Sequence, residues 1–131
     1  MQLVDTNVVS ELMRTRPNPG VLEWKVRAAR FALSAITVEE LLFGLSLKRM
    51  GRLEMWLEEL VRDHCEVLPV SDGVARESGR LRASLQLSGK IRHLPDMLIA
   101  ATARVHNLVL VSRNVRDFSE SGIRLFNPFS S

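Results

Sequence analysis

The chain has 131 residues, of which 46% are hydrophobic, 25% charged and 5% aromatic. A domain of this length buries roughly 65% of its unfolded surface, so it needs no disulfide or metal to supply a core, and disordered and fibrous proteins are excluded. No apolar run approaches the roughly 20 residues of a bilayer span. Since the opening residues also lack the pattern of a secretory signal, we expect a single cytoplasmic domain, residues 1–131, with no membrane partner.

Charge and cysteine content narrow the possible functions further. Lys and Arg outnumber Asp and Glu by 18 to 15, and a net charge of +3 is only a weak indication of an anionic partner such as nucleic acid. Cys65 is the only cysteine, so the chain can form neither an internal disulfide nor a thiolate metal cluster. Redox chemistry is therefore not expected.

Short apolar runs alternate with helical periodicity along the chain. A strand at 2–4 leads into a helix through residue 12, and a loop with two prolines precedes a helix over 21–26. A strand at 31–34 is followed by helices over 37–45 and 52–61, and then by a strand at 67–70. The remaining segments are a helix over 72–85, a polar loop, a helix over 96–106 that Pro95 opens, and strands at 108–111 and 123–126. Strands that alternate with helices predict an α/β fold, in which a parallel sheet is covered by helices on both faces.

Ligands of such sheets bind beyond the carboxyl ends of the strands. Several polar side chains follow the predicted strands or open the helices near them: Asp5, Glu39, Glu40, Asp96, Ser112, Asn114 and Asp117. Each also has a purely structural interpretation, since Asp5 or Asn7 can cap a helix, Thr37 and Glu40 match a capping box, Asp96 suits a first helical turn and Asp117 suits a turn.

Acidic groups that converge on one edge repel each other unless a cation lies among them. The candidate ligands are hard oxygen atoms without clustered cysteine or histidine, which indicates Mg²⁺ or Mn²⁺ rather than zinc. The sequence therefore predicts a metal site that acts on phosphate esters.

Four segments in order resemble the motifs of PIN-domain nucleases. They are LVDTNVVSEL (3–12), SAITVEEL (34–41) with Gly44, PDMLIAATA (95–103) and LVSRNVRDF (110–118). The overall layout is similar to that of VapC toxins, and the ending Asn127-Pro128-Phe129 resembles the FitB-like branch. The resemblance implies a PIN-like three-layer α/β/α fold with a central, mainly parallel sheet of about five strands.

The same resemblance assigns roles to individual residues. It implies a catalytic metal site of Asp5, Glu40, Asp96 and Asp117 for Mg²⁺, with Mn²⁺ as a substitute. Asn114 would bind the metal or orient a water molecule, while Thr6 and Asn7 would lie beside the ligands or touch the scissile phosphate. Ser112 stands where the family more often has threonine, and because a hydroxyl remains we expect the change to be tolerated.

The implied activity is hydrolysis of RNA phosphodiesters by metal-activated water, in the toxin of a toxin-antitoxin module. The implied partners are RNA, a VapB-like antitoxin and a second copy in a homodimer, with DNA bound only through the antitoxin. Since carboxylates repel RNA, the chain also needs a basic rim. The candidates for RNA contact are Lys90, Arg92, His93, Arg113 and Arg116.

Other interpretations remain open at this point. A metal-free ribonuclease would use histidines, but His64 and His106 fall near helix C-termini and only His93 lies near the expected site. Phosphoryl transfer to Asp5 in the manner of haloacid-dehalogenase-like phosphatases would need a further acid at the position of Asn7, and receiver domains would need adjacent acids near the start and a lysine after a late strand. A catalytically inactive PIN-like module that binds RNA or protein is the main alternative. The apolar residues of the helices at 37–45 and 52–61 form either core or an interface.

Overall fold

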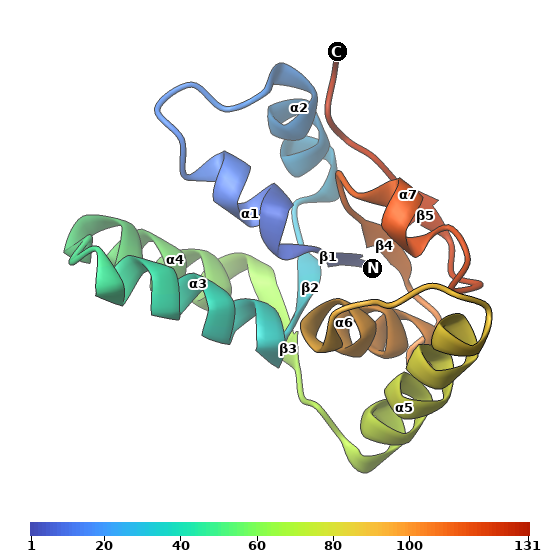
Figure 1. The fold of residues 1–131 in the computed structure, drawn as a ribbon. Coiled ribbons are helices and arrows are strands. Elements are labelled where there is room, and N and C mark those ends of the chain that lie inside the picture. The colour runs from blue at the N-terminus through green and yellow to red at the C-terminus, as the bar shows by residue number, and fades with distance from the viewer.

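The computed structural model describes residues 1–131, in which five strands form one wholly parallel sheet (Figure 1). The strand order is β3-β2-β1-β4-β5, and every neighbouring pair is parallel. The strands are β1 (Gln2–Val4), β2 (Phe31–Ser34), β3 (Cys65–Leu68), β4 (Val109–Val111) and β5 (Leu125–Phe126). The predicted α/β class and the five-stranded parallel sheet are confirmed.

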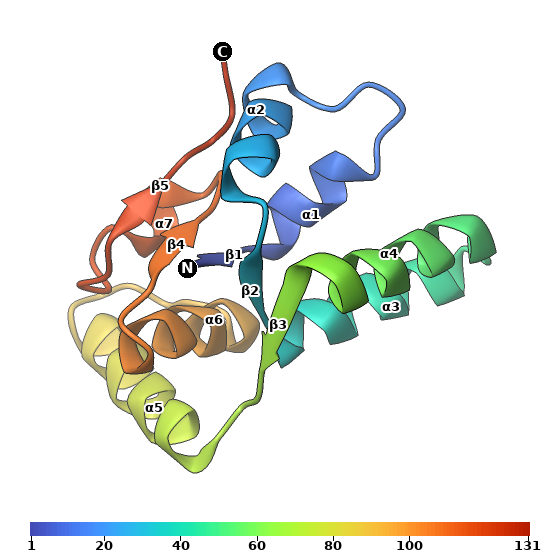
Figure 2. The ribbon, with the colours of Figure 1, turned by 180° about the vertical axis from the view of Figure 1, so that it is seen from behind.

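Seven helices cover the two faces of this sheet. They are α1 (Thr6–Leu12), α2 (Pro19–Ala28), α3 (Ala35–Leu47), α4 (Gly51–His64), α5 (Asp72–Leu87), α6 (Leu94–Val105) and α7 (Val115–Phe118). Helices α1 to α4 pack on one face and α5 to α7 on the other, which the views from front and back both show (Figures 1 and 2). None of the seven combines the length and apolar character that a bilayer span requires.

Two hydrophobic clusters arise because successive side chains of a strand point to opposite faces of the sheet. In β1, Val4 joins the cluster under α1 to α4, whereas Leu3 joins the cluster under α5 to α7. In β4, Val111 and Leu110 are divided between the clusters in the same way. Strands buried on both faces show continuous apolar runs, which explains why the sequence reveals them so clearly.

The two outer strands, β3 and β5, have other bounds than the sequence predicts. Helix α4 continues to His64, so β3 begins at Cys65, two residues before the predicted start, and its register pairs Cys65 with Phe31. Because Glu66, the second residue of β3, is charged and exposed, the apolar pattern of the sequence does not reveal where this edge strand begins. The last strand is shorter than predicted, because only Leu125 and Phe126 pair with β4.

Candidate active site

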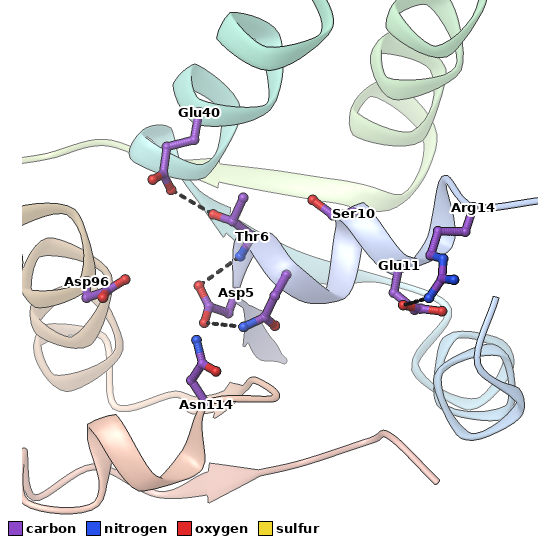
Figure 3. A pocket seen from close by; sticks show the side chains of 9 residues that line it. Asp5, Thr6, Ser10, Glu11, Arg14, Glu40, Asp96 and Asn114 are labelled. Carbon is purple, nitrogen blue, oxygen red and sulfur yellow. Dashed lines mark hydrogen bonds and ion pairs between the residues drawn. The ribbon is translucent and has the colours of Figure 1, made fainter. Parts of the chain in front are cut away.

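A pocket with no hydrophobic side chain in its lining lies at the carboxyl edge of the sheet (Figure 3). Its walls come from the end of β1, from α1, from α3, from the start of α6 and from the loop after β4. Nine residues line it: Asp5, Thr6, Asn7, Ser10, Glu11, Arg14, Glu40, Asp96 and Asn114. Parallel strands therefore deliver side chains from distant parts of the sequence to one edge, as predicted.

Asp5 is the buried centre of the pocket and also caps α1. Its Oδ1 accepts a 2.8 Å hydrogen bond from the backbone N–H of Thr6, and its Oδ2 accepts bonds from Asn7 Nδ2 (3.2 Å) and from the Ser112 hydroxyl (2.7 Å). Burial raises the pKa of Asp5, while these three hydrogen bonds work in the opposite direction. Asp5 therefore caps α1 and lies in the pocket at the same time, so its role as a helix cap does not exclude a role as a metal ligand.

Glu40 is tied to the first strand through Thr6. The Thr6 hydroxyl donates a 2.8 Å hydrogen bond to Glu40 Oε1 and lies 3.1 Å from the hydroxyl of Thr37. The capping box of Thr37 and Glu40 is wrong: Ser34 caps α3, because its hydroxyl accepts from the N–H of Ile36. Thr37 therefore lies within the first turn, fully buried, and the Glu40 side chain is free to face the pocket (Figure 3).

Asp96 lies in the first turn of α6, across the pocket from Glu40 (Figure 3). Burial raises its pKa most, and the negative charges of Asp5, Glu40 and Asp117 raise it further, whereas His93 lowers it. These carboxylates therefore act on one another electrostatically, which favours a cation between them.

The donors around this pocket are carboxylate, amide and hydroxyl oxygen atoms, a set that fits Mg²⁺ or Mn²⁺. No three His, Cys, Asp or Glu side chains lie close enough together in this structure to hold a metal ion. The four-acid metal site consequently stays a prediction.

Hydrogen bonds of Ser112 and Asn7 connect the carboxyl ends of the neighbouring strands β1 and β4. Besides its bond to Asp5, the Ser112 oxygen accepts a 2.9 Å hydrogen bond from the backbone N–H of Asn114. The Asn7 side-chain oxygen accepts from the backbone N–H of Arg113 at 3.2 Å. Asn114 precedes α7 and lines the pocket, so the polar neighbours that the sequence predicts beside Asp5 are brought together.

Asp117 is the predicted acid that the structure does not place in the pocket lining. It lies on α7, a short helix that the sequence analysis did not predict, and its side chain is exposed. Its charge nevertheless contributes to the raised pKa of Asp96. A role as fourth metal ligand remains a prediction.

None of the five predicted RNA-contact residues lines the pocket. Lys90 pairs with Glu120, and Arg92 donates to the backbone oxygen of Asp117 at 3.3 Å. The guanidinium of Arg113 lies 4.9 Å from the centre of the Phe129 ring. His93 and Arg116 are both exposed, and His93 immediately precedes α6.

Three lining residues were not predicted from the sequence as site residues: Ser10, Glu11 and Arg14. Glu11 is buried, and it forms an ion pair with Arg14 between Oε1 and Nη1 at 3.3 Å. The available signal was their spacing, since Asn7, Glu11 and Arg14 recur at helical intervals along one face.

A parallel α/β domain with an acidic pocket at its strand ends is the architecture that these observations define. The PIN domain family model matches residues 3–122. The chain is 34% identical to Toxin FitB of Neisseria gonorrhoeae (98% of this chain, 99% of the relative) and 33% identical to VapC ribonuclease Y4jK of Sinorhizobium fredii (98% of each). It is also similar to the crystal structure of DNA-bound VapBC from Salmonella typhimurium, with a TM-score of 0.84, 28% identity and coverage of 98% and 99%. The chain belongs to the PIN-domain family, among the toxins of the VapC and FitB type.

Proposed function

We propose that this chain is a Mg²⁺-dependent endoribonuclease and the toxin of a VapBC-type module. The observation that carries the proposal is the polar pocket of Asp5, Glu40 and Asp96 at the strand ends of a PIN domain. Relatives that bear the name VapC ribonuclease support RNA as the substrate. Mn²⁺ is expected to substitute for Mg²⁺, since both prefer carboxylate oxygens.

Asp5, Glu40 and Asp96 would hold the cation, with Asp117 as the proposed fourth ligand. When bound, the cation would neutralise charge on the phosphate and lower the pKa of a water molecule so that it can attack at neutral pH. The Ser112 hydroxyl and the N–H of Thr6 fix the orientation of the Asp5 carboxylate. The Thr6 hydroxyl does the same for Glu40, so the protein holds two acids in place before any ligand arrives.

Attack by water requires no 2′-hydroxyl nucleophile. The expected products therefore carry a 5′-phosphate and a 3′-hydroxyl, in contrast to the cyclic phosphates that a histidine-based ribonuclease leaves. Since the proposed substrate is RNA inside the cell, the proposal places the chain in the cytoplasm.

A VapB-like antitoxin and a second copy of the chain are the proposed protein partners, and DNA would be bound only through the antitoxin. The solved VapBC relative with bound DNA supports this arrangement. The apolar residues predicted as core or interface are mainly core, since Leu41, Leu45, Leu57 and Leu60 are buried. The α3–α4 hairpin still exposes the apolar side chains of Phe43, Leu47, Met50 and Met55, which are the candidates for contact with a partner.

The direct test is incubation of the purified protein with a folded RNA pool in Mg²⁺, Mn²⁺ or EDTA, followed by analysis of the product ends. We expect metal-dependent cuts with 5′-phosphates, which Asp5→Asn abolishes. Glu23→Gln, which removes an exposed acid of α2, is the matched control and should cleave like the wild type. Total cellular RNA left intact by the antitoxin-free wild type would favour an inactive binding module instead.

A further inference from the structure

The pocket has an end that the proposed hydrolysis does not use. Four of its nine lining residues are acids, and Arg14 is the only cation among them. Arg14 and Glu11 lie at the opposite end of α1 from Asp5 and Asp96 (Figure 3). An anionic strand that enters the pocket therefore meets one positive side chain inside it.

Both carboxylate oxygens of Glu11 are bonded at this end of the pocket and not to residues of the acidic centre. Its Oε1 contacts Arg14 Nη1 at 3.3 Å, and its Oε2 accepts a 2.8 Å hydrogen bond from the backbone N–H of Asn18. Only 7% of Glu11 is exposed. Both carboxylate oxygens thus hold the loop after α1 and the Arg14 guanidinium.

The ion pair with Glu11 fixes the position of the Arg14 side chain but leaves most of its guanidinium free to bind a ligand. Its side chain is 68% exposed, and a single Nη1 contact to Glu11 leaves the rest of the guanidinium fork free. Such a fork matches the geometry of a phosphate, and the fixed ion pair reduces the rotamer entropy lost when a ligand binds.

Helix α1 sets the spacing between this end and the acidic centre. Asn7, Ser10 and Glu11 recur at intervals of three and four residues along one side of α1, and Arg14 lies just beyond Leu12, the last residue of the helix. At about 1.5 Å per residue, the helix advances about 7 Å from Asn7 to Leu12, and the ion pair with Glu11 holds the Arg14 guanidinium at that end. That distance corresponds to a few nucleotides, given an axial rise of about 3.4 Å per nucleotide in a duplex strand.

We propose that Arg14 binds an RNA phosphate a few nucleotides from the scissile bond and that Glu11 is the positioning residue for its guanidinium. The inference rests on the proposed ribonuclease function and adds to it the site that sets how the strand lies along α1. Glu11 is accordingly not a ligand of the catalytic metal.

The test compares Arg14→Gln with Arg27→Gln, a matched loss of an exposed arginine that pairs with Glu23 on α2. Binding of a fluorescently labelled single-stranded RNA is measured by anisotropy over a NaCl series in an Asp5→Asn background, and cleavage is measured in the active chain. We expect Arg14→Gln to weaken binding about tenfold at low salt and to reduce the slope of log K against log salt by about 1, whereas Arg27→Gln changes neither. The effect on cleavage should fall on KM rather than kcat.

Glu11→Gln should raise KM in the same way, because the amide no longer holds the guanidinium. In the double variant, Glu11→Gln should add nothing to the KM effect of Arg14→Gln, an outcome that a merely structural role would not produce. Near-UV circular dichroism checks that each variant is folded.

Equal binding by the Arg14→Gln and Arg27→Gln variants at every salt concentration would overturn the role of Arg14. Loss of kcat in a folded Glu11→Gln variant would instead assign Glu11 to the acidic centre. In both cases wild-type cleavage would still stand, whereas a wild type that neither binds nor cuts RNA would overturn the proposed function itself and this inference with it.

Discussion

The Ser112 hydroxyl donates a 2.7 Å hydrogen bond to Oδ2 of Asp5, and thereby joins two residues 107 positions apart in the sequence. The two side chains follow β4 and β1, which are neighbours in the sheet. Ser112 is fully buried, so no water can replace its hydroxyl without rearrangement. The orientation of the central carboxylate therefore depends on the register of these two strands.

Replacement of Ser112 by Ala should affect both stability and activity. The buried Asp5 carboxylate and the Asn114 N–H each lose a partner, so we expect the free energy of unfolding to fall by about 1 to 3 kcal/mol. Ser112→Thr keeps the hydroxyl and should retain metal-dependent cleavage. Urea denaturation and the RNA cleavage assay measure the two effects, and an Ala variant as stable and active as the wild type would show that the bond is dispensable.

Neutralising Asp5 should stabilise the chain in metal-free buffer at neutral pH. Burial raises the pKa of Asp5 above its ordinary value of 3.8, so the folded state binds this proton more tightly than the unfolded state. The ionised carboxylate consequently lowers stability as the pH rises above about 4, with the loss complete above the folded pKa. We expect Asp5→Asn to melt at a higher temperature than the wild type at pH 7 in EDTA, with a difference that shrinks as the pH approaches 4.

The control for this pH series is Asp72→Asn. Asp72 is exposed in the first turn of α5 and pairs with Arg76, so its neutralisation removes a favourable interaction and should not stabilise the chain at pH 7. Asp96→Asn should behave like Asp5→Asn, because its pKa is raised as well. A difference between Asp5→Asn and wild type that does not change with pH would contradict the electrostatic explanation.

Mg²⁺ should offset the loss of folding stability that the ionised Asp5 and Asp96 carboxylates cause. A ligand that binds only the folded state stabilises it by about 2.7 kcal/mol at a concentration one hundred times its Kd. At matched ionic strength, we expect Mg²⁺ to raise the melting temperature of the wild type and to have little effect on the double variant Asp5→Asn with Asp96→Asn. Glu23→Gln should keep the full response, and an equal response in the double variant would place the cation elsewhere.

Two glycines should respond in opposite directions to replacement by Ala. A Cβ at Gly20 would lie 2.3 Å from the backbone oxygen of Pro128 and 2.7 Å from the backbone nitrogen of Ser130, so the C-terminal segment beside α2 would have to move, at a cost of about 1 to 3 kcal/mol. Gly44 in α3 has no atom within 4 Å of such a Cβ, and Ala there should stabilise the isolated chain by about 0.5 to 1 kcal/mol. Thermal denaturation of both variants tests the pair.

The sequence revealed the parts of the fold that local patterns determine. The apolar runs of β1 and β2, and the helix that Pro95 opens, are visible without any tertiary information. The start of β3 depends instead on its register with Phe31, and the length of β5 depends on how far it pairs with β4. Such pairings join residues far apart in the chain, which periodicity cannot detect.

The same distinction applies to the candidate site. Asp5, Glu40 and Asp96 follow from motif and strand position, and all three line the pocket. The role of Ser34 as the cap of α3 and the ion pair of Glu11 with Arg14 depend on side-chain geometry. Basic residues chosen for their nearness to Asp96 in the sequence, such as Lys90, have other partners in space.

The central position of β1 has a consequence for synthesis of the chain. Asp5 is synthesised 107 residues before Ser112, yet β1 lies between β2 and β4, and the Ser112 hydroxyl orients the Asp5 carboxylate. A growing chain that ends before β4 contains Asp5, Glu40 and Asp96 but cannot assemble their final arrangement. For the proposed ribonuclease, products truncated before β4 should therefore lack activity, although they contain all three of these acids.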